Sequence, residues 1–260
     1  MRGEIGHHYG PQVHILDDPL ALTLLAKLCA EETVQPKINR LVEALYRQMV
    51  CAVAARELPT MEVRVPTRMV RANPAALWKG RIVDPHAKVA VVCVARAGIF
   101  PAQVCYDFLN EILEPSGVRQ DHMLMNRTTN ASGQVQGAAI HGAKIGGTVE
   151  NTTLIIPDPM GATGATLVTL LEHYRQHVPG KPARVITLNL IVTPEYIRRL
   201  AEASPDTLVY AYRLDRGLSP EEVLAAAPGQ YWDRERGLNE NGYIIPGGGG
   251  FGEIMNNAYV

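Results

Sequence analysis

Aromatic residues are scarce in this sequence and make up 6% of its 260 positions. Proteins that bind single-stranded nucleic acid stack bases on several aromatic rings, so this composition argues against such a platform. Charge of either sign is not in excess, because 25 Lys and Arg residues stand against 26 Asp and Glu residues, a formal net charge of -1. The basic surface of a nucleic-acid-binding protein is therefore not expected.

Long apolar runs are missing, and cysteine is rare. No apolar stretch of the sequence is long enough to span a bilayer, and the first residues lack the pattern of a secretory signal peptide. The four cysteines lie in apolar surroundings without the spacing of a metal site, at positions Cys29, Cys51, Cys93 and Cys105. We therefore expect reduced core residues in a cytoplasmic protein that contacts no membrane.

Two common nucleotide-binding motifs are also absent. No Gly-Lys-Ser/Thr follows a glycine turn, and Gly161 and Gly164 do not form a Gly-x-Gly-x-x-Gly fingerprint. Residues 153–166 contain a different arrangement, which reads as a buried strand, an acid, a turn of small residues and the start of a helix.

The segment at residues 153–166 predicts an anion site beside a carboxylate. Asp158 would stand at the carboxyl end of its strand, where open α/β sheets bind ligands. Small residues let the backbone approach a bound group, and the helix adds the positive end of its dipole. An acid for sugar hydroxyls next to a phosphate cradle points to a phosphorylated sugar, whereas a plain strand–turn–helix connection is the alternative.

Apolar runs alternate with segments of helical periodicity after residue 88, which predicts a doubly wound, mostly parallel α/β sheet. The expected strands are residues 89–94, 122–125, 153–156, 184–192 and 207–214, and the expected helices are residues 100–113, 164–177 and 194–203. Two helices should precede them, one beginning at Asp17-Asp18-Pro19 and one near residues 33–36. An arm or hairpin is expected at residues 61–85.

Three segments do not fit this alternation. Residues 1–16 read as a loose lead-in, where a mobile tail is favoured over a metal site at His7, His8 and His14. Residues 128–147 are polar and rich in glycine, so we expect either a functional loop or disorder. The glycine-rich tail at residues 242–252 is not expected to form a regular element.

Two more loops could share the ligand edge of the sheet with Asp158. Arg96-Ala97-Gly98 follows the strand at residues 89–94, and a guanidinium fork suits phosphate or diphosphate. A solvated Arg at a helix start is the alternative. Tyr243-Ile244-Ile245-Pro246 resembles packed structure more than a flexible linker.

Together these three motifs resemble the uracil phosphoribosyltransferases, which are type I phosphoribosyltransferases. The family's ribose-phosphate loop matches residues 158–166, its Arg-Ala-Gly loop matches residues 96–98, and its Gly-Leu-Asn-Glu-x-Gly-Tyr-Ile-Ile-Pro-Gly tail matches residues 237–247. The resemblance runs from about residue 17 to residue 253. It implies one phosphoribosyltransferase domain over residues 1–260, a base-binding hood at residues 237–253, and a homodimer with the arm as a candidate contact.

The resemblance implies transfer of a phosphoribosyl group from phosphoribosyl diphosphate, handled with Mg²⁺, to uracil. Asp158 would favour positive charge on the ribose, and Arg96 would neutralise the leaving diphosphate. Residues implied for phosphoribosyl diphosphate are Arg96, Ala97, Gly98, Arg127, Asp158, Pro159, Met160, Gly161, Ala162, Thr163, Gly164, Ala165 and Thr166. Residues implied for the base are Tyr243, Ile244, Gly247, Gly249, Gly250 and Gly252. No protein ligand of the metal is assigned.

The sequence departs from the family pattern at several places. Gly250 stands where the family has Asp, and Glu253 is the late acid that remains. Residues 216–236 are an insertion, so either Asp215 or Glu235 could take the place of the acid that precedes the family tail. Two alternatives therefore stay open: a transferase for another nucleobase-like acceptor, and a non-catalytic regulator that binds phosphoribosyl diphosphate or a nucleotide. Activation by GTP is not decided.

Overall fold

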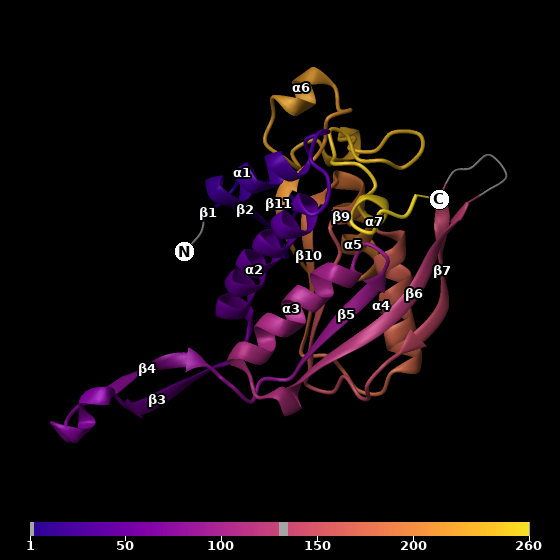
Figure 1. The fold of residues 1–260 in the computed structure, drawn as a ribbon. Coiled ribbons are helices and arrows are strands. Elements are labelled where there is room, and N and C mark those ends of the chain that lie inside the picture. Colours follow the sequence, from indigo (N-terminus) through magenta and orange to yellow (C-terminus); the bar gives the residue numbers. More distant parts are fainter. Residues whose placement is uncertain (1–2, 130–134, 260) are drawn as a thin grey trace.

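The computed structural model describes residues 3–129 and 135–259, which are organised around a central sheet (Figure 1). In the described chain this sheet has nine strands in the order β1-β2-β11-β10-β8-β5-β6-β7, with β9 paired to β10. These strands are β1 Gly3–Glu4, β2 Val13–Asp17, β5 Val89–Ala95, β6 Val118–Thr129, β7 Val135–Lys144, β8 Thr153–Pro157, β9 Met160–Gly161, β10 Arg184–Val192 and β11 Leu208–Leu214. Strands β2, β11, β10, β8, β5 and β6, in this order across the sheet, run parallel to one another. Strands β1 and β7 pair antiparallel at the two edges. The prediction of a mostly parallel α/β sheet is confirmed.

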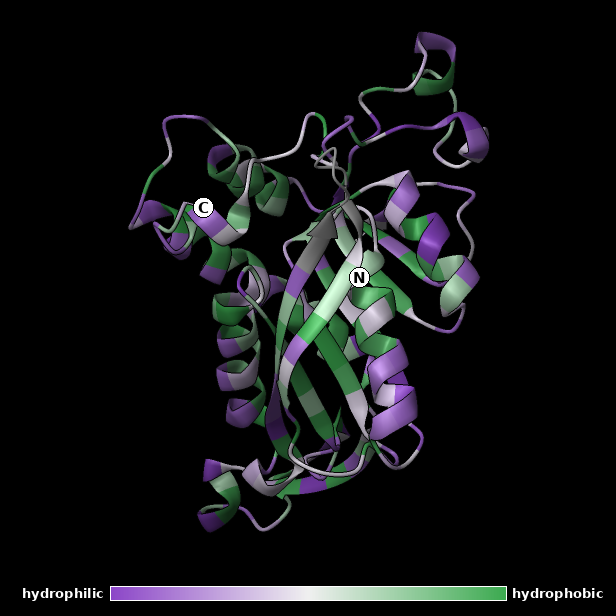
Figure 2. Cartoon of the chain, turned by 90° about the vertical axis from the view of Figure 1, so that its right-hand side faces the viewer, coloured by the Kyte–Doolittle hydropathy of each residue, from purple (hydrophilic) through white to green (hydrophobic). Residues whose placement is uncertain are grey.

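Helices cover both faces of the sheet. One face carries α1 Pro19–Leu28, α2 Lys37–Glu57 and α3 Ile99–Ile112, and the other carries α4 Ala165–His177 and α5 Pro194–Ala203. In Figure 2 the strands deep between the helical layers are mostly hydrophobic, whereas the strands nearest the viewer also carry hydrophilic stretches. This is the two-sided burial that a parallel sheet requires.

Strand β5 shows how one apolar run supplies both layers. Successive side chains of a strand point to opposite faces. Val89, Val91 and Cys93 therefore join the core with α1, α2 and α3, whereas Ala90, Val92 and Val94 join the core with α4 and α5. A continuous apolar sequence is needed because neither face of this strand meets water.

Residues 60–83 form the expected hairpin. Strands β3 Thr60–Pro66 and β4 Leu77–Val83 pair antiparallel and project from the body of the molecule (Figure 1). Large apolar side chains are exposed along this arm, including Met69 at 62% and Trp78 at 48%. Such exposure is unusual for a free surface.

The expectation of a loose lead-in over residues 1–16 is wrong. Strand β2 pairs parallel with β11, and its first four residues are buried. His14 stacks on Tyr210 with ring centroids 4.4 Å apart, and no group of three or more His, Cys, Asp or Glu residues within the described chain could hold a metal. Pairing with β11 decides the structure of β2, because its five residues show no clear periodicity of their own.

The expectation of a functional or disordered loop at residues 128–147 is also wrong for its described part. Strand β6 continues to Thr129, and β7 pairs back along it from Val135↔Thr129 to Lys144↔His122. Residues 130–134, between the two strands, lie outside the described residues. Small and glycine residues have low strand propensity by themselves, so pairing with β6 decides the structure here.

Two of the four cysteines depart from the expected core position. Cys93 and Cys105 are buried, but Cys29 is half-buried and Cys51 is exposed, and none of these four cysteines forms a disulfide within the described chain. No helix in the part of the chain that the structure describes is long and apolar enough to cross a membrane.

The segment at residues 216–236, the insertion expected from the family pattern, leaves the sheet and returns to the same point. Gly217 donates its N–H to the Ile245 carbonyl at 3.0 Å, and Ile245 donates its N–H to the Gly237 carbonyl at 2.8 Å. Between these ends lies the short helix α6 Glu221–Leu224. The tail can therefore follow Asp215 in space although the insertion separates them in sequence.

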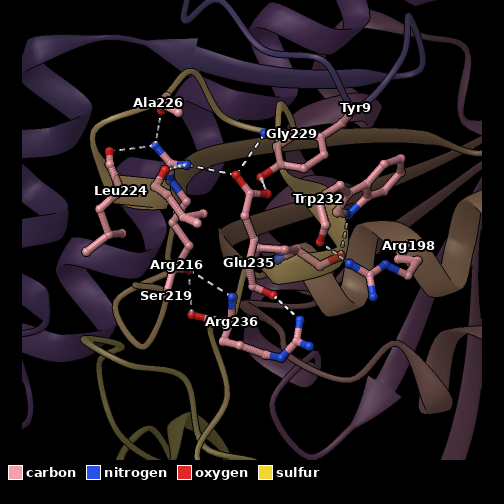
Figure 3. Close-up of polar contacts among 12 residues, drawn as sticks. Tyr9, Arg198, Arg216, Ser219, Leu224, Ala226, Gly229, Trp232, Glu235 and Arg236 are labelled. Atoms are coloured by element: carbon pink, nitrogen blue, oxygen red, sulfur yellow. Dashed lines mark hydrogen bonds and ion pairs between the residues drawn. The ribbon is translucent and has the colours of Figure 1, made fainter. Parts of the chain in front are cut away.

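A buried ion pair closes the base of the insertion (Figure 3). Glu235 is fully buried and accepts from Arg216 Nη1 at 2.7 Å, from Gly229 N–H at 2.9 Å and from the Tyr9 hydroxyl at 2.5 Å. Burial raises the pKa of Tyr9, and the hydrogen bond to Glu235 raises it further, so this phenol remains a donor. The contact links the N-terminal segment to the insertion.

Candidate functional site

A pocket of about 920 Å³ lies beyond the carboxyl ends of the central strands. It brings together three segments that are far apart in sequence: the loop after β5, the loop from β8 to α4, and the C-terminal tail. Arg96, Thr163 and Tyr243 all line it. The three loops therefore share one cavity, as the strand-edge argument predicts.

Asp158 follows β8 directly, and its main chain is fixed by two contacts. Its N–H donates to the Leu188 carbonyl at 3.0 Å, and its carbonyl accepts from Asn189 Nδ2 at 2.6 Å. Asn189 is itself held by the buried Tyr196 hydroxyl, which lies 3.2 Å from Asn189 Oδ1. Asp158 lines the pocket above this hydrogen-bonded layer.

The loop after Asp158 leads into the amino end of α4. Gly164 has a φ of +75°, a left-handed conformation that side chains other than glycine rarely adopt. Gly164 provides no side-chain cap for α4, and the hydroxyl of the preceding Thr163 accepts from the N–H of Ala165, the first residue of the helix, at 3.3 Å. Thr163, Gly164 and Thr166 line the pocket at this point, where the dipole of α4 is positive.

Arg96 stands directly after β5. The turn that carries it is close-packed, because a Cβ at Gly98 would lie 2.7 Å from the Val94 carbonyl oxygen. The guanidinium donates from Nη1 to the Ala258 carbonyl at 3.0 Å and from Nη2 toward Glu253 Oε1 at 3.3 Å. The cation of the pocket is therefore in contact with the end of the chain.

The tail is organised by a turn and one acid. Asn239 Oδ1 accepts from Tyr243 N–H at 2.9 Å, and Leu238 bridges to Ile244. Asp215 accepts the N–H of Gly247 at 2.7 Å. Of the two acids considered above, Asp215 supports the tail and Glu235 closes the insertion. The tail also ends in a short helix, α7 Phe251–Ile254, which corrects the expectation that its last residues are irregular.

Arg213 completes this support of the tail. It pairs with Asp215 at 2.7 Å and donates to the Gly247 carbonyl at 2.8 Å. Burial alone would lower the pKa of Arg213, but its hydrogen bonds and charge interaction with Asp215 raise it above the usual value. Both main-chain groups of Gly247 are thus used inside the protein.

Most residues expected at the site line the pocket. Those expected for phosphoribosyl diphosphate that do so are Arg96, Ala97, Asp158, Met160, Ala162, Thr163, Gly164 and Thr166. Those expected for the base that do so are Tyr243, Ile244, Gly249, Gly250 and Gly252. Residues placed outside the lining are Gly98, Pro159, Gly161, Ala165 and Gly247. The side chain of Arg127 lies outside the described residues, and its backbone belongs to β6.

Sequence reasoning left several lining residues unassigned. Asn126 lines the pocket because β6 continues past the expected strand end. Tyr196 reaches the pocket from α5, and no local pattern in that helix indicates it. Glu253 could have been found, since it is the late acid of the tail.

Comparison with known proteins shows the family of the chain. The family model for uracil phosphoribosyltransferase matches residues 15–236. The chain belongs to this family. It is 26% identical over 239 residues to the uracil phosphoribosyltransferase of Thermococcus sibiricus, covering 91% of this chain and 86% of that protein. It is 28% identical over 244 residues to the one of Dictyoglomus thermophilum, covering 94% and 98%.

A solved structure supports the fold of this family member independently. The AQ2163 protein from Aquifex aeolicus has a TM-score of 0.71 at 20% identity, with 95% of this chain and 99% of that chain covered. The fold thus extends over almost the whole of both chains.

Proposed function

We propose that the protein transfers the phosphoribosyl group of phosphoribosyl diphosphate to uracil and releases UMP and diphosphate. The observation that carries this proposal is the single pocket lined by Arg96, Asp158, Thr163 and the tail. Such a pocket combines a cation, an acid, an anion cradle and a set of exposed main-chain groups. Each corresponds to one part of the two substrates.

The 5′-phosphate binds at the amino end of α4. The first N–H groups of this helix and the hydroxyls of Thr163 and Thr166 donate to its oxygens, where the helix dipole favours negative charge. Asp158 accepts from the ribose hydroxyls beside this cradle. The sugar is fixed between the two, which positions its C1 for reaction.

Bond exchange takes place at the ribose C1. The bond from C1 to the diphosphate oxygen breaks, and positive charge builds on the ring while the diphosphate takes the electron pair. The Asp158 carboxylate stabilises this positive charge, and Arg96 stabilises the departing anion. The bond from C1 to N1 of uracil then forms, and the N1 proton leaves to solvent.

The tail reads the base with its main chain. Ile244 and the glycines of residues 248–250 line the pocket, so N–H and C=O groups can meet the alternating donors and acceptors of an imide edge. A side chain dedicated to uracil is not required. The base specificity follows from the path of the backbone.

The carboxylates in the pocket fit a magnesium ion that enters with the substrate. Asp158 and Glu253 are the carboxylates among the lining residues, and no larger cluster of metal-type side chains occurs within the described chain. Mg²⁺ is commonly bound by one or two carboxylates together with substrate phosphates. Asp158 is the residue that would contact it, and the ion would neutralise diphosphate charge.

A base panel tests the proposed function. The purified protein is mixed with phosphoribosyl diphosphate, Mg²⁺ and labelled uracil, cytosine, adenine, guanine or hypoxanthine, and the nucleotide formed is measured. We expect UMP from uracil and little product from the other bases. A product with another base only would replace uracil as the acceptor. Tight binding of phosphoribosyl diphosphate without any product would indicate a regulator.

We further propose that the protein is cytoplasmic and forms a homodimer in which each protomer contacts the other through the arm. The exposed apolar side chains of β3 and β4 support this assembly, since a second copy would cover them.

A further inference from the structure

The Arg96 guanidinium is already engaged on both of its terminal nitrogens. Ala258 O accepts from Nη1 at 3.0 Å, and Glu253 Oε1 lies 3.3 Å from Nη2. The two side chains are 37% and 32% exposed. A diphosphate that approaches this fork therefore meets a cation whose donors face acceptors of the protein itself.

The position of Glu253 depends on a missing side chain. Gly250 has φ -81° and ψ 92°, a conformation open to any residue. A Cβ at this position would overlap Oε2 of Glu253. The carboxylate of Glu253 thus fills the space that a side chain at position 250 would occupy, and it lines the pocket from there.

The surrounding turn keeps Glu253 at the mouth of the pocket. Its carbonyl accepts from the N–H groups of Asn256 and Ala258, each at 3.2 Å. Gln35, two residues before α2, donates from Nε2 to the Met255 carbonyl at 2.8 Å. The segment that carries both acceptors of Arg96 is therefore attached to the body of the protein.

We propose that Glu253 is a positioning residue for Arg96 that competes with diphosphate for its guanidinium. This rests on the proposed function, because it assumes that diphosphate binds at Arg96. Two anions cannot share one partly exposed guanidinium without mutual repulsion. A half-exposed ion pair is weak, so diphosphate displaces Glu253 on entry, and Glu253 takes Arg96 back when diphosphate leaves.

Pyrophosphate binding without metal tests the competition. Isothermal titration at low ionic strength compares the native protein with Glu253→Gln, which keeps the shape and removes the charge. We expect Glu253→Gln to bind pyrophosphate about two- to fivefold more tightly, the range set by a surface ion pair. In turnover assays its KM for phosphoribosyl diphosphate should fall as well.

A second variant displaces the carboxylate without removing it. Gly250→Ala should push Glu253 away from Arg96 and also tighten pyrophosphate binding, by a smaller factor than Glu253→Gln. Glu202→Gln, the same chemical change at an exposed position on α5, is the matched control and should bind pyrophosphate as the native protein does.

The outcomes separate this inference from the proposed function. Equal or weaker pyrophosphate binding by Glu253→Gln overturns the competition, even if UMP is formed normally. A lower melting temperature with unchanged affinity would mean that Glu253 has a structural role only, which also overturns it. Tighter binding by Glu253→Gln in a protein that makes no UMP would leave the competition standing and remove the proposed reaction.

Discussion

Asp158 uses its main chain for the fold, and its side chain lines the pocket, where Oδ1 also accepts from the Met160 N–H at 3.4 Å. The main-chain contacts to Leu188 and Asn189 are independent of the charge on the carboxylate. A change of Asp to Asn should therefore leave this layer in place. The separation makes Asp158 a suitable position for testing chemistry without disturbing stability.

Asp158→Asn should lower kcat for UMP formation by about 10²- to 10³-fold, the usual effect of removing one preorganised electrostatic group. Its melting temperature should stay close to that of the native protein. Steady-state kinetics and thermal unfolding of both proteins provide the check. Full activity in the variant would show that another group stabilises the ribose.

Burial should make the reactivity of the cysteine thiols depend on pH. Burial raises the pKa of Cys93 to about 11, and burial also raises the pKa of Cys29 and Cys105. The thiolate is the reactive form, so Cys93 and Cys105 should not react with a thiol reagent at pH 8. Exposed Cys51 should give the fast phase, and Cys51→Ser should remove it.

Spectrophotometric titration with a disulfide reagent measures these phases. Four thiols should react once the protein is unfolded in guanidinium, and Cys93 should gain reactivity in the folded state only as the pH approaches about 11. A fast reaction of Cys105 at pH 8 would contradict its burial in the core.

Residues 216–236 form an excursion of the chain that returns to its starting point beside the tail. Its ends meet at Ile245, and the pair of Arg216 and Glu235 closes its base. Arg216 also donates to the carbonyls of Val223, Leu224 and Ala226, so one guanidinium holds several turns of the insertion (Figure 3). The ordering of this segment therefore depends on a buried charge pair.

Glu235→Ala should destabilise the protein by about 3–5 kcal/mol, because it leaves the largely buried Arg216 without its carboxylate partner. The Tyr9 hydroxyl and the Gly229 N–H lose their acceptor in the same variant. Denaturant unfolding followed by circular dichroism measures the free energy. Glu222→Ala, which breaks an exposed pair with Arg234, is the control and should change stability little. An unchanged midpoint for Glu235→Ala would contradict the closing role.

The elements differ in how far the sequence determines them. Continuous apolar runs such as residues 89–94 and 184–192 indicate strands by themselves, and helices such as α5 have a cap, a proline and a clear periodicity. Strands β2 and β7 lie at or near edges of the sheet and depend on a partner. Their residues carry no strong local signal, so pairing in the folded molecule decides them.

For the whole molecule, the parallel sheet explains why the site was largely predictable. Carboxyl ends of parallel strands meet at one edge, so loops after β5 and β8 must be neighbours there. The strand-edge rule alone does not predict that the tail joins the site, because no strand leads into the tail. Its sequence motif was needed as well. The pairing of Glu253 with Arg96 depends on the space at Gly250, which becomes visible only in three dimensions.

The apolar side chains of the arm remain exposed to solvent within the described chain. Trp78 and Met69 are exposed at 48% and 62%. Trp78→Glu should shift the proposed homodimer toward monomers, since a charge would have to be buried in the contact. Size-exclusion chromatography with light scattering measures the mass of each species.

Lys79→Glu is the matched control for this prediction. Lys79 neighbours Trp78 on β4 but points to the opposite face of the hairpin, because side chains alternate along a strand. The Lys79→Glu variant changes the charge next to Trp78 along β4 but places its carboxylate on the face opposite the indole. A monomer mass for the native protein, or an equal effect of the two variants, would contradict an assembly held by the apolar face of Trp78.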